Sequence, residues 1–307
     1  MPERSVIERL DEVVDAILAG RSAPVIDADV AMLASIAVDL RDLPDPAFKE
    51  ELGRRFFVSV KPGLQTITPY FVIDGVAKFI TFLEQAFGAK ELARYPRPDG
   101  SIMHAAVQLG DSNIEMGDAT QQYQPLQMAM HVYVDDVDAV FERAVRAGAT
   151  TLMGITDQFY GDREASLRDP FGNHWYIATH IATKGKPPGF RAVTPFLHPH
   201  GTDRLIDFLK RAFDAQELER TPAKDGTIMH ATMRIGDSVI EMGEAHGQWQ
   251  PMPGNIHLYV GDADAVYRKA IDAGATSIFA VVDQPYGERS GGVTDPFGNR
   301  WYMATPK

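Results

Sequence analysis

Cysteine is absent from the 307 residues of the chain. This absence excludes disulfide bonds, thiolate nucleophiles and thiolate zinc sites, so a metal ion would have to be bound by His, Asp or Glu. No apolar run approaches the roughly 18 residues that span a bilayer. The first residues, 1–4, lack the basic and then apolar order of a signal peptide. We therefore expect a cytoplasmic protein without a membrane partner.

The chain also lacks a strongly basic stretch. Its net charge is -12 and its isoelectric point is near 5.2, so it would repel a phosphate backbone, and nucleic acid is not an expected partner. No nucleotide-binding loop, HExxH zinc helix or hydrolase nucleophile elbow is found in the sequence. With 45% apolar and 23% charged residues, the composition is typical of two or three globular domains.

An internal repeat organises most of the chain. Residues 68–180 align without a gap with residues 194–306, a shift of 126 positions, and about half of the aligned residues agree. Residues 99–105 and 169–173, for example, recur almost unchanged at 225–231 and 295–299. A recent duplication would also leave idle residues alike, so retention between the copies is weak evidence for function.

Each copy divides into two similar units. In the first, a short apolar strand at 68–73 precedes a helical apolar pattern at 76–87, and three strands follow at 92–94, 102–109 and 113–116. The same order recurs as a strand at 131–134, a helix at 137–147 and strands at 151–155, 166–168 and 175–178. Because one small curved sheet leaves an apolar face and an edge open, two such units should pair. The sequence therefore predicts an α+β fold built of four β-α-β-β-β modules.

Several motifs in this order resemble PhnB-like proteins of the vicinal-oxygen-chelate superfamily, which includes glyoxalases, bleomycin-resistance proteins and dioxygenases. They are Thr-Pro-Tyr at 68–70, Asp-Gly-x-Ile-Met-His-Ala at 99–105, Gly-Asp-Ser-x-Ile-Glu-Met at 110–116, Gln-x-Tyr-Gly-x-Arg at 158–163 and Asp-Pro-Phe-Gly-Asn-x-Trp at 169–175. The resemblance covers about three quarters of the chain. It implies tandem glyoxalase-like domains at 66–182 and 193–307, in which pairs of modules form curved-sheet cups.

Two segments lie outside the repeat. Residues 1–62 carry apolar stripes at helical spacing and predict a small α-helical N-terminal segment. Residues 183–192 are rich in turn-forming residues and predict a linker between the copies. Because one chain already holds two copies, we expect a pseudo-dimer within the chain, as a monomer or a homodimer.

The resemblance also indicates where a site would lie, because metal-using members draw their ligands from the first and last strands of both units. The corresponding positions of the first copy are Tyr70, Glu115, His131 and Tyr176, and those of the second copy are Phe196, Glu241, His257 and Tyr302. Modules could pair within a copy or be exchanged between copies. In the exchanged arrangement, Glu115 would face His257 and Glu241 would face His131.

One Glu and one His in each set are candidate metal ligands or, without a metal, a candidate acid–base pair. Catalytic zinc or iron usually has about three protein ligands, so Fe, Mn, Ni or Zn would need a third, for example from His104 or His230. A Glu–His pair in an apolar cup could instead perform acid–base chemistry. Alternatively, the Glu and His of each set are hydrogen-bonded residues of the pocket without a catalytic role.

Further residues are candidates for ligand contacts. The aromatic ones could stack a flat molecule or could be core, and the two arginines could clamp an anion or could form surface salt bridges. Beyond His104 and His230, these candidates are Tyr133, Tyr160, Arg163, Trp175, Tyr176, Tyr259, Tyr286, Arg289, Trp301 and Tyr302.

Three functions stay open at this point. The first is a protein that sequesters or senses a small apolar or aromatic molecule, and the second is a divalent-metal-dependent lyase, isomerase or dioxygenase with Glu115, His131, Glu241 and His257 as its catalytic residues. The third is a scaffold with degenerate cups. The two Asp-Pro-Phe-Gly segments are interpreted as structural turns.

Overall fold

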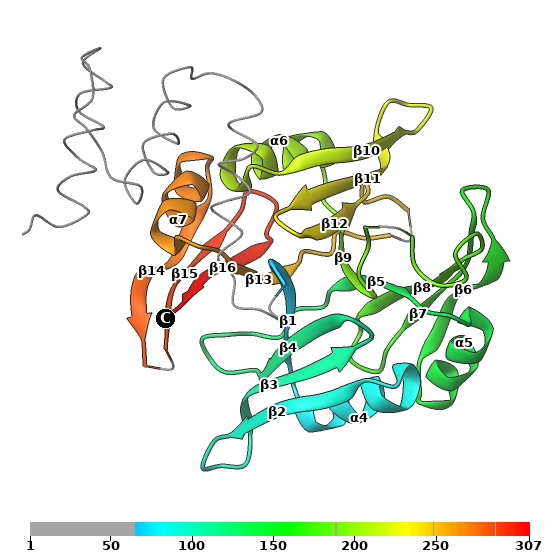
Figure 1. The fold of residues 1–307 in the computed structure, drawn as a ribbon, viewed down its shortest axis with the longest axis horizontal. Helices are drawn as coiled ribbons and strands as arrows, with labels where there is room; N and C mark the ends of the chain where they lie inside the picture. Colours follow the sequence, from blue (N-terminus) through cyan, green and yellow to red (C-terminus); the bar gives the residue numbers. More distant parts are fainter. Residues whose placement is uncertain (1–64, 188, 248, 286) are drawn as a thin grey trace, which may run out of the picture. The chain divides into compact units, whose positions relative to one another are not determined.

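The computed structural model describes residues 65–187, 189–247, 249–285 and 287–307. These residues form two curved eight-stranded sheets and four helices (Figure 1). No helix in these residues is long and apolar enough to cross a membrane. The predicted helical segment at 1–62 lies outside the described residues.

The order of elements in the first copy repeats in the second. The first copy contains β1 (Ile67–Ile73), α4 (Val76–Phe87), β2 (Lys90–Pro96), β3 (Ile102–Leu109), β4 (Ser112–Asp118), β5 (Ala129–Tyr133), α5 (Val137–Arg146), β6 (Thr150–Asp157), β7 (Asp162–Arg168) and β8 (His174–His180). The second contains β9 (Val193–Leu197), α6 (Thr202–Phe213), β10 (Gln216–Pro222), β11 (Ile228–Ile235), β12 (Ser238–Met242), β13 (Asn255–Tyr259), α7 (Ala263–Asp272), β14 (Thr276–Gln284), β15 (Glu288–Thr294) and β16 (Arg300–Pro306). The α+β fold and the β-α-β-β-β order are therefore confirmed.

The two copies exchange halves. One sheet has the order β14-β15-β16-β13-β1-β4-β3-β2, so its halves come from different copies, and the other has the order β10-β11-β12-β9-β5-β8-β7-β6. The copies join where β1 pairs antiparallel with β13 and where β5 pairs antiparallel with β9. We call the hollow face of the first sheet cup 1 and that of the second sheet cup 2. Of the two arrangements open to the sequence, the structure has the exchanged one.

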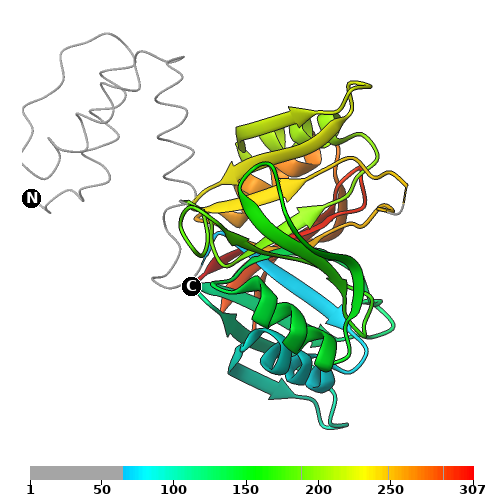
Figure 2. The same ribbon diagram turned by 90° about the vertical axis from the view of Figure 1, so that its right-hand side faces the viewer.

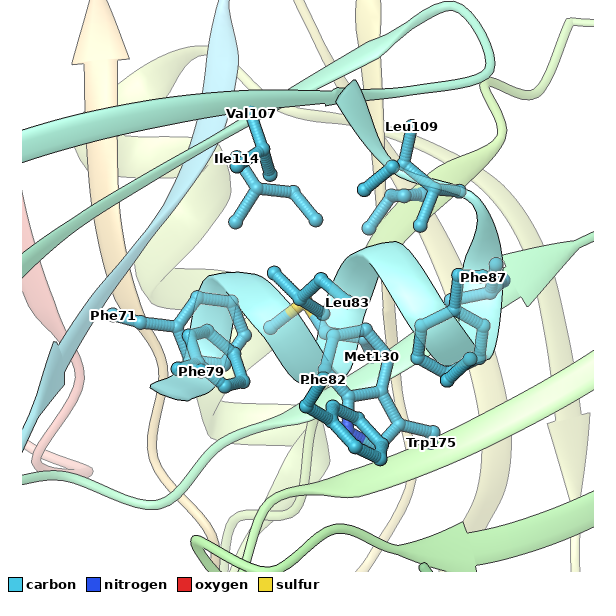
Figure 3. Packing of buried hydrophobic residues seen from close by; sticks show 14 of the residues in the cluster. Phe71, Phe79, Phe82, Leu83, Phe87, Val107, Leu109, Ile114, Met130 and Trp175 are labelled. Atoms are coloured by element: carbon cyan, nitrogen blue, oxygen red, sulfur yellow. The ribbon is translucent and has the colours of Figure 1, made fainter. Parts of the chain in front are cut away.

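The hydrophobic cores, in contrast, lie almost entirely within the copies. The first copy's core includes Phe79, Leu83 and Phe87 of α4, and Trp175 of β8 packs against Phe87 at a ring distance of 4.8 Å (Figure 3). Helices α4 and α5 lie side by side over this core (Figure 2), and α6 and α7 take the same places in the second copy. Burying each large apolar side chain stabilises the fold by about 1.5–3 kcal/mol. Each copy is thus a packing unit, whereas each cup needs both.

Local chemistry explains where the helices begin and end. The side chain of Asp136 accepts a hydrogen bond from Ala139 N at the start of α5, and Asp262 caps α7 in the same way. Helix α4 ends at Gly88, whose φ of 73° lies in the left-handed region that glycine adopts without strain. These signals are local, which is why the sequence predicts the helix bounds closely.

Candidate functional site

Strand register brings the four expected positions of cup 1 together. Tyr70 of β1 pairs with Glu115 of β4, and His257 of β13 pairs with Tyr302 of β16. The antiparallel pairing of β1 with β13 then places Thr68 opposite His257, so these strands form the centre of the sheet. Glu115 comes from the first copy and His257 from the second.

Glu115 and His257 are in direct contact. His257 Nδ1 donates to Glu115 Oε2 at 2.7 Å, and the Tyr259 hydroxyl donates to Glu115 Oε1 at 2.9 Å. Burial alone would raise the pKa of Glu115 and lower that of His257, but the attraction between the two charges outweighs burial and shifts each pKa the opposite way. The pair is therefore a buried carboxylate–imidazolium pair.

A cavity of about 260 Å³ lies above this pair in cup 1. Four aromatic side chains contribute to its walls, and the side chain of Arg97 is the one cation of the lining other than the histidine. Glu115 is not part of the lining, so it acts on the cavity through His257. The lining residues are Tyr70, Val72, Arg97, Met103, Gly117, Asp118, Tyr123, His257, Phe279, Ser290 and Tyr302.

Cup 2 contains the equivalent pair. His131 Nδ1 donates to Glu241 Oε2 at 2.9 Å, and His230 Nε2 lies 3.2 Å from Glu241 Oε1. Burial would lower the pKa of His131, but Glu241 raises it to about 9. Burial would likewise raise the pKa of Glu241, and His131 lowers it to about 2. This second pair is therefore also a carboxylate–imidazolium pair.

Cup 2 also has polar groups that cup 1 lacks. Glu164 accepts a hydrogen bond of 2.5 Å from the Tyr160 hydroxyl, and its burial raises its pKa. The Tyr176 hydroxyl contacts His198 Nε2 at 2.8 Å, and burial lowers the pKa of His198 to about 4. A neutral His198 stacks on Trp249 at 6.2 Å. The two cups therefore differ in chemistry although they share a fold.

Comparisons with known proteins agree with this geometry. The model of the glyoxalase/bleomycin resistance protein/dioxygenase superfamily matches residues 65–177 and 201–303. The chain belongs to this superfamily. The match occurs once in each copy, which also agrees with the internal repeat.

Individual relatives cover either one copy or both. An uncharacterized protein of Mycobacterium tuberculosis is 36% identical over 139 residues, which are 42% of this chain and 80% of the relative. One of Mycobacterium bovis is 38% identical over 131 residues, 39% of this chain and 84% of the relative. The crystal structure of glyoxalase I from Zea mays superposes with a TM-score of 0.62 at 14% identity, covering 78% of this chain and 92% of that one. This last likeness shows the fold alone, and the PhnB-like branch stays a prediction.

The Glu–His pairs do not fit the metal site that the resemblance implied. Each pair directs a carboxylate oxygen and an imidazole nitrogen at each other rather than at a common point, and a protonated imidazole has no lone pair for a metal. The other two positions of each set are aromatic. His104 stacks on Tyr70 at 6.0 Å. In the described part of the chain, no group of three or more His, Asp or Glu is arranged to hold a metal.

Four of the ligand candidates lie away from the cups. Arg163 donates to Asp138 and Asp157 at 2.7–2.8 Å, and Arg289 forms the matching ion pairs with Asp264 and Asp283. These arginines thus form the salt bridges that were the alternative to a ligand clamp. Trp175 and Trp301 are fully buried in the helix-covered cores, so we do not retain them as ligand contacts.

Both tryptophans instead complete a polar turn. The carboxylate of Asp169 accepts hydrogen bonds from Trp175 Nε1, from the side chain and backbone of Asn173, and from Phe171 N, and Asp295 repeats these contacts. The Asp-Pro-Phe-Gly segments are therefore structural, as predicted.

The remaining candidates lie in or beside the cups. Tyr133 and Tyr259 stand next to the two central histidines at ring distances of 4.3 and 4.4 Å, and Tyr302 lines the cavity. Tyr286 lies outside the described residues. Sequence reasoning missed Arg97, Tyr123, Phe279 and Ser290 of the cavity and Glu164 of cup 2. The alternation of β7, which places Asp162, Glu164 and Ser166 opposite the core residues Ala165 and Leu167, could have revealed Glu164.

A larger hollow of about 590 Å³ opens outside the cups. It lies between residues 72–74, 125–127, 170–171 and 251–253, and four prolines contribute to its walls. It contains no histidine, and Asp74 is the one ionisable group of its lining. We therefore place the candidate site in the cups.

Proposed function

We propose that the protein is a small-molecule-binding member of the superfamily, and that cup 1 binds a small aromatic compound. The observation that carries this proposal is the cavity of about 260 Å³ with Tyr70, Tyr123, Phe279 and Tyr302 in its walls. A dry cavity of about 150 Å³ is enough for benzene, and drug-sized pockets begin near 300 Å³. The cavity therefore suits a ligand of one or two rings, which the protein would sequester or sense.

The aromatic rings of the cavity are arranged to contact a flat ligand. Phe279 and Tyr302 are stacked with an interplanar angle of 26° at 6.2 Å, and Tyr70 lies 6.4 Å from Tyr302 at a steeper angle. Offset and edge contacts of this kind contribute about 0.5–1.5 kcal/mol each beyond the area that they bury. His257, held by Glu115, would donate to a polar substituent of the ligand.

The metal-dependent alternative has less support, because Glu115 Oε2 and His257 Nδ1, which could each bind a metal, are hydrogen-bonded to each other instead. Elemental analysis of protein purified without a chelator would test it directly. A stoichiometric Fe, Mn, Ni or Zn signal that is lost in Glu115→Ala would favour the enzyme and contradict the binder.

The binding proposal is tested by the thermal unfolding of the full chain in the presence of mono- and bicyclic aromatic compounds. A bound ligand at 100 times its Kd stabilises by about 2.7 kcal/mol, which is a measurable rise in Tm. Phe279→Ala should weaken binding roughly tenfold, because it removes one ring contact and its buried area. Met153 stands at the aligned position of the second copy, so Met153→Ala is the matched control and should leave binding unchanged. If no compound of a broad set raises Tm, the proposal is wrong.

A further inference from the structure

The interiors of the two cups differ most on one strand. With the shift of 126 positions, Glu164 and Ser166 of β7 correspond to Ser290 and Gly292 of β15. Cup 2 therefore has a buried carboxyl group and a buried hydroxyl group where cup 1 has a smaller hydroxyl residue and no side chain.

Strand register gathers these groups around the central histidine of cup 2. His131 pairs with Tyr176, and Tyr176 pairs with Ser166, so the three residues form one row across β5, β8 and β7. Glu164 lies one step along the same face of β7, next to the small Ala178. The carboxyl group of Glu164 and the ring of His131 are close enough to shift each other's pKa. These side chains therefore lie close together on one face of the sheet.

Several polar atoms of these side chains could form further hydrogen bonds. His131 Nε2 and Ser166 Oγ are buried and have no hydrogen-bond partner among the residues that the structure describes. His131 is 7% exposed and Ser166 is 0% exposed, so bulk water does not satisfy either atom. Glu164, 7% exposed, accepts one hydrogen bond, from Tyr160, although a carboxylate can accept several. Native proteins rarely leave such groups unpaired without a reason.

Tyr160, in the turn before β7, contacts Glu164 from the surface of the protein. Tyr160 is 52% exposed, and its hydroxyl nevertheless reaches the buried Glu164. The other carboxylates of the cup, Asp162 and Glu241, are already in contact with imidazoles. Glu164 is therefore the acidic group of cup 2 with acceptor capacity for an incoming molecule.

We propose that cup 2 is a second binding site, which takes a small polar molecule whose head group has a hydrogen-bond donor beside an acceptor, as a primary carboxamide does. Glu164 accepts from the amide N–H. Ser166 Oγ and the protonated His131 Nε2 donate to the carbonyl oxygen. Cup 1 lacks this set, because Ser290 and Gly292 stand in place of Glu164 and Ser166, and its Glu288 carboxylate is in an ion pair with His257 Nε2 at 3.8 Å. The proposal concerns residues that the aromatic site of cup 1 does not use.

The test uses the full chain and isobutyramide, which has no ring and so is a poor ligand for an aromatic cavity. NMR titration should give saturable shifts of the His131 ring signals. 3-Methylbutan-2-one has the same shape but a methyl group in place of the amide nitrogen, and it should bind at least tenfold more weakly. The loss of one hydrogen bond to a charged acceptor corresponds to about that factor.

Two variants test whether isobutyramide binds in cup 2. Glu164→Ser and Ser166→Gly introduce the residues of cup 1 at these positions, and each should weaken isobutyramide binding at least tenfold. The ring signals of His257 in cup 1 report that the variants remain folded, and Phe279→Ala should bind isobutyramide like the wild type. Shifts confined to cup 1, no saturable shift at His131, or wild-type affinity in both variants would each overturn the proposal. Aromatic binding in cup 1 involves none of these residues, so the two proposals can fail separately.

Discussion

Replacing Glu241 by Gln tests the charge state of the buried pair in cup 2. In the wild type, Glu241 contributes most to the raised pKa of His131, about 9, compared with an ordinary value near 6.5. Gln keeps the size of the side chain and a carbonyl acceptor but removes the charge. Burial then weighs more heavily against the remaining charges of Glu164 and Asp162, and the pKa of His131 should fall. The variant should lose the stability that a protonated His131 contributes.

The direction and magnitude of this change in stability follow from the linkage between protonation and folding. A group whose pKa is higher in the folded state stabilises the protein fully below its unfolded pKa and loses this effect as the pH rises through the folded pKa. For His131 the window is therefore pH 6.5 to 9, and a difference of about 2.5 pKa units corresponds to about 3 kcal/mol. The lowered pKa of Glu241 describes the same interaction. Its stabilisation is fully present above pH 4.5 and is lost as the pH falls towards about 2, so it adds no pH dependence between pH 6 and 9.5 and is not counted again.

Urea unfolding at pH 6 and at pH 9.5, followed by tryptophan fluorescence, measures the effect. Glu241→Gln should have a lower free energy of unfolding than the wild type. This deficit should be about 3 kcal/mol larger at pH 6 than at pH 9.5. Glu142→Gln, which changes a carboxylate on the exposed face of α5, should show no such dependence on pH. An equal deficit of Glu241→Gln at both pH values would refute an imidazolium at His131.

Two further substitutions test other parts of the fold. Asp169→Ala should lower the free energy of unfolding by about 3 kcal/mol or more in urea titrations, because Trp175 Nε1 and the Asn173 amide lose a buried acceptor; a loss below about 1 kcal/mol would contradict the role of this turn. Gly117→Ala should cost about 1–3 kcal/mol and weaken aromatic ligands of cup 1, because the new Cβ would lie 2.8 Å from Met103 O and 2.9 Å from the Tyr70 hydroxyl. Unchanged binding in calorimetric titration would show that Tyr70 does not shape the cavity.

The sequence predicts those features that depend on local pattern or on the repeat. The apolar face of α4 and the stop at Gly88 are local signals, and the structure has the helix where they place it. The positions of Tyr70, Glu115, His257 and Tyr302 follow from counting along strands, and strand register brings them together as expected.

The exchange of halves could not be predicted from the sequence. In either copy, the last strand of the first module along the chain carries the Glu, and the first strand of the second module carries the His. Either pairing of modules therefore brings one such Glu and one such His into each cup. The choice depends on the pairing of β1 with β13 and of β5 with β9, for which the sequence has no separate pattern.

The prediction that Trp175 and Trp301 contact a ligand was wrong for a different reason. Trp175 and Tyr176 are neighbours on β8, and adjacent strand residues face opposite sides of a sheet. Tyr176 contacts Phe196 in cup 2 at a ring distance of 5.1 Å, so Trp175 must face the core. Strict use of this alternation would have excluded Trp175 and Trp301. The salt bridges of Arg163 and the loop residues of the cavity, in contrast, depend on tertiary contacts that no short pattern encodes.

The exchange also explains how two copies in one chain can diverge in function. Each core lies almost entirely within one copy, so most substitutions there act on one packing unit. Each cup, in contrast, combines the first half of one copy with the second half of the other. A substitution in β7, such as the one that distinguishes Glu164 from Ser290, changes cup 2 and leaves the residues of cup 1 untouched. The Glu–His pairs join the two copies across both cups, and breaking a buried pair of this kind typically costs about 3–5 kcal/mol. The pairs thus hold the copies together while the walls around them are free to differ, which is the pattern that two cups with different ligands require.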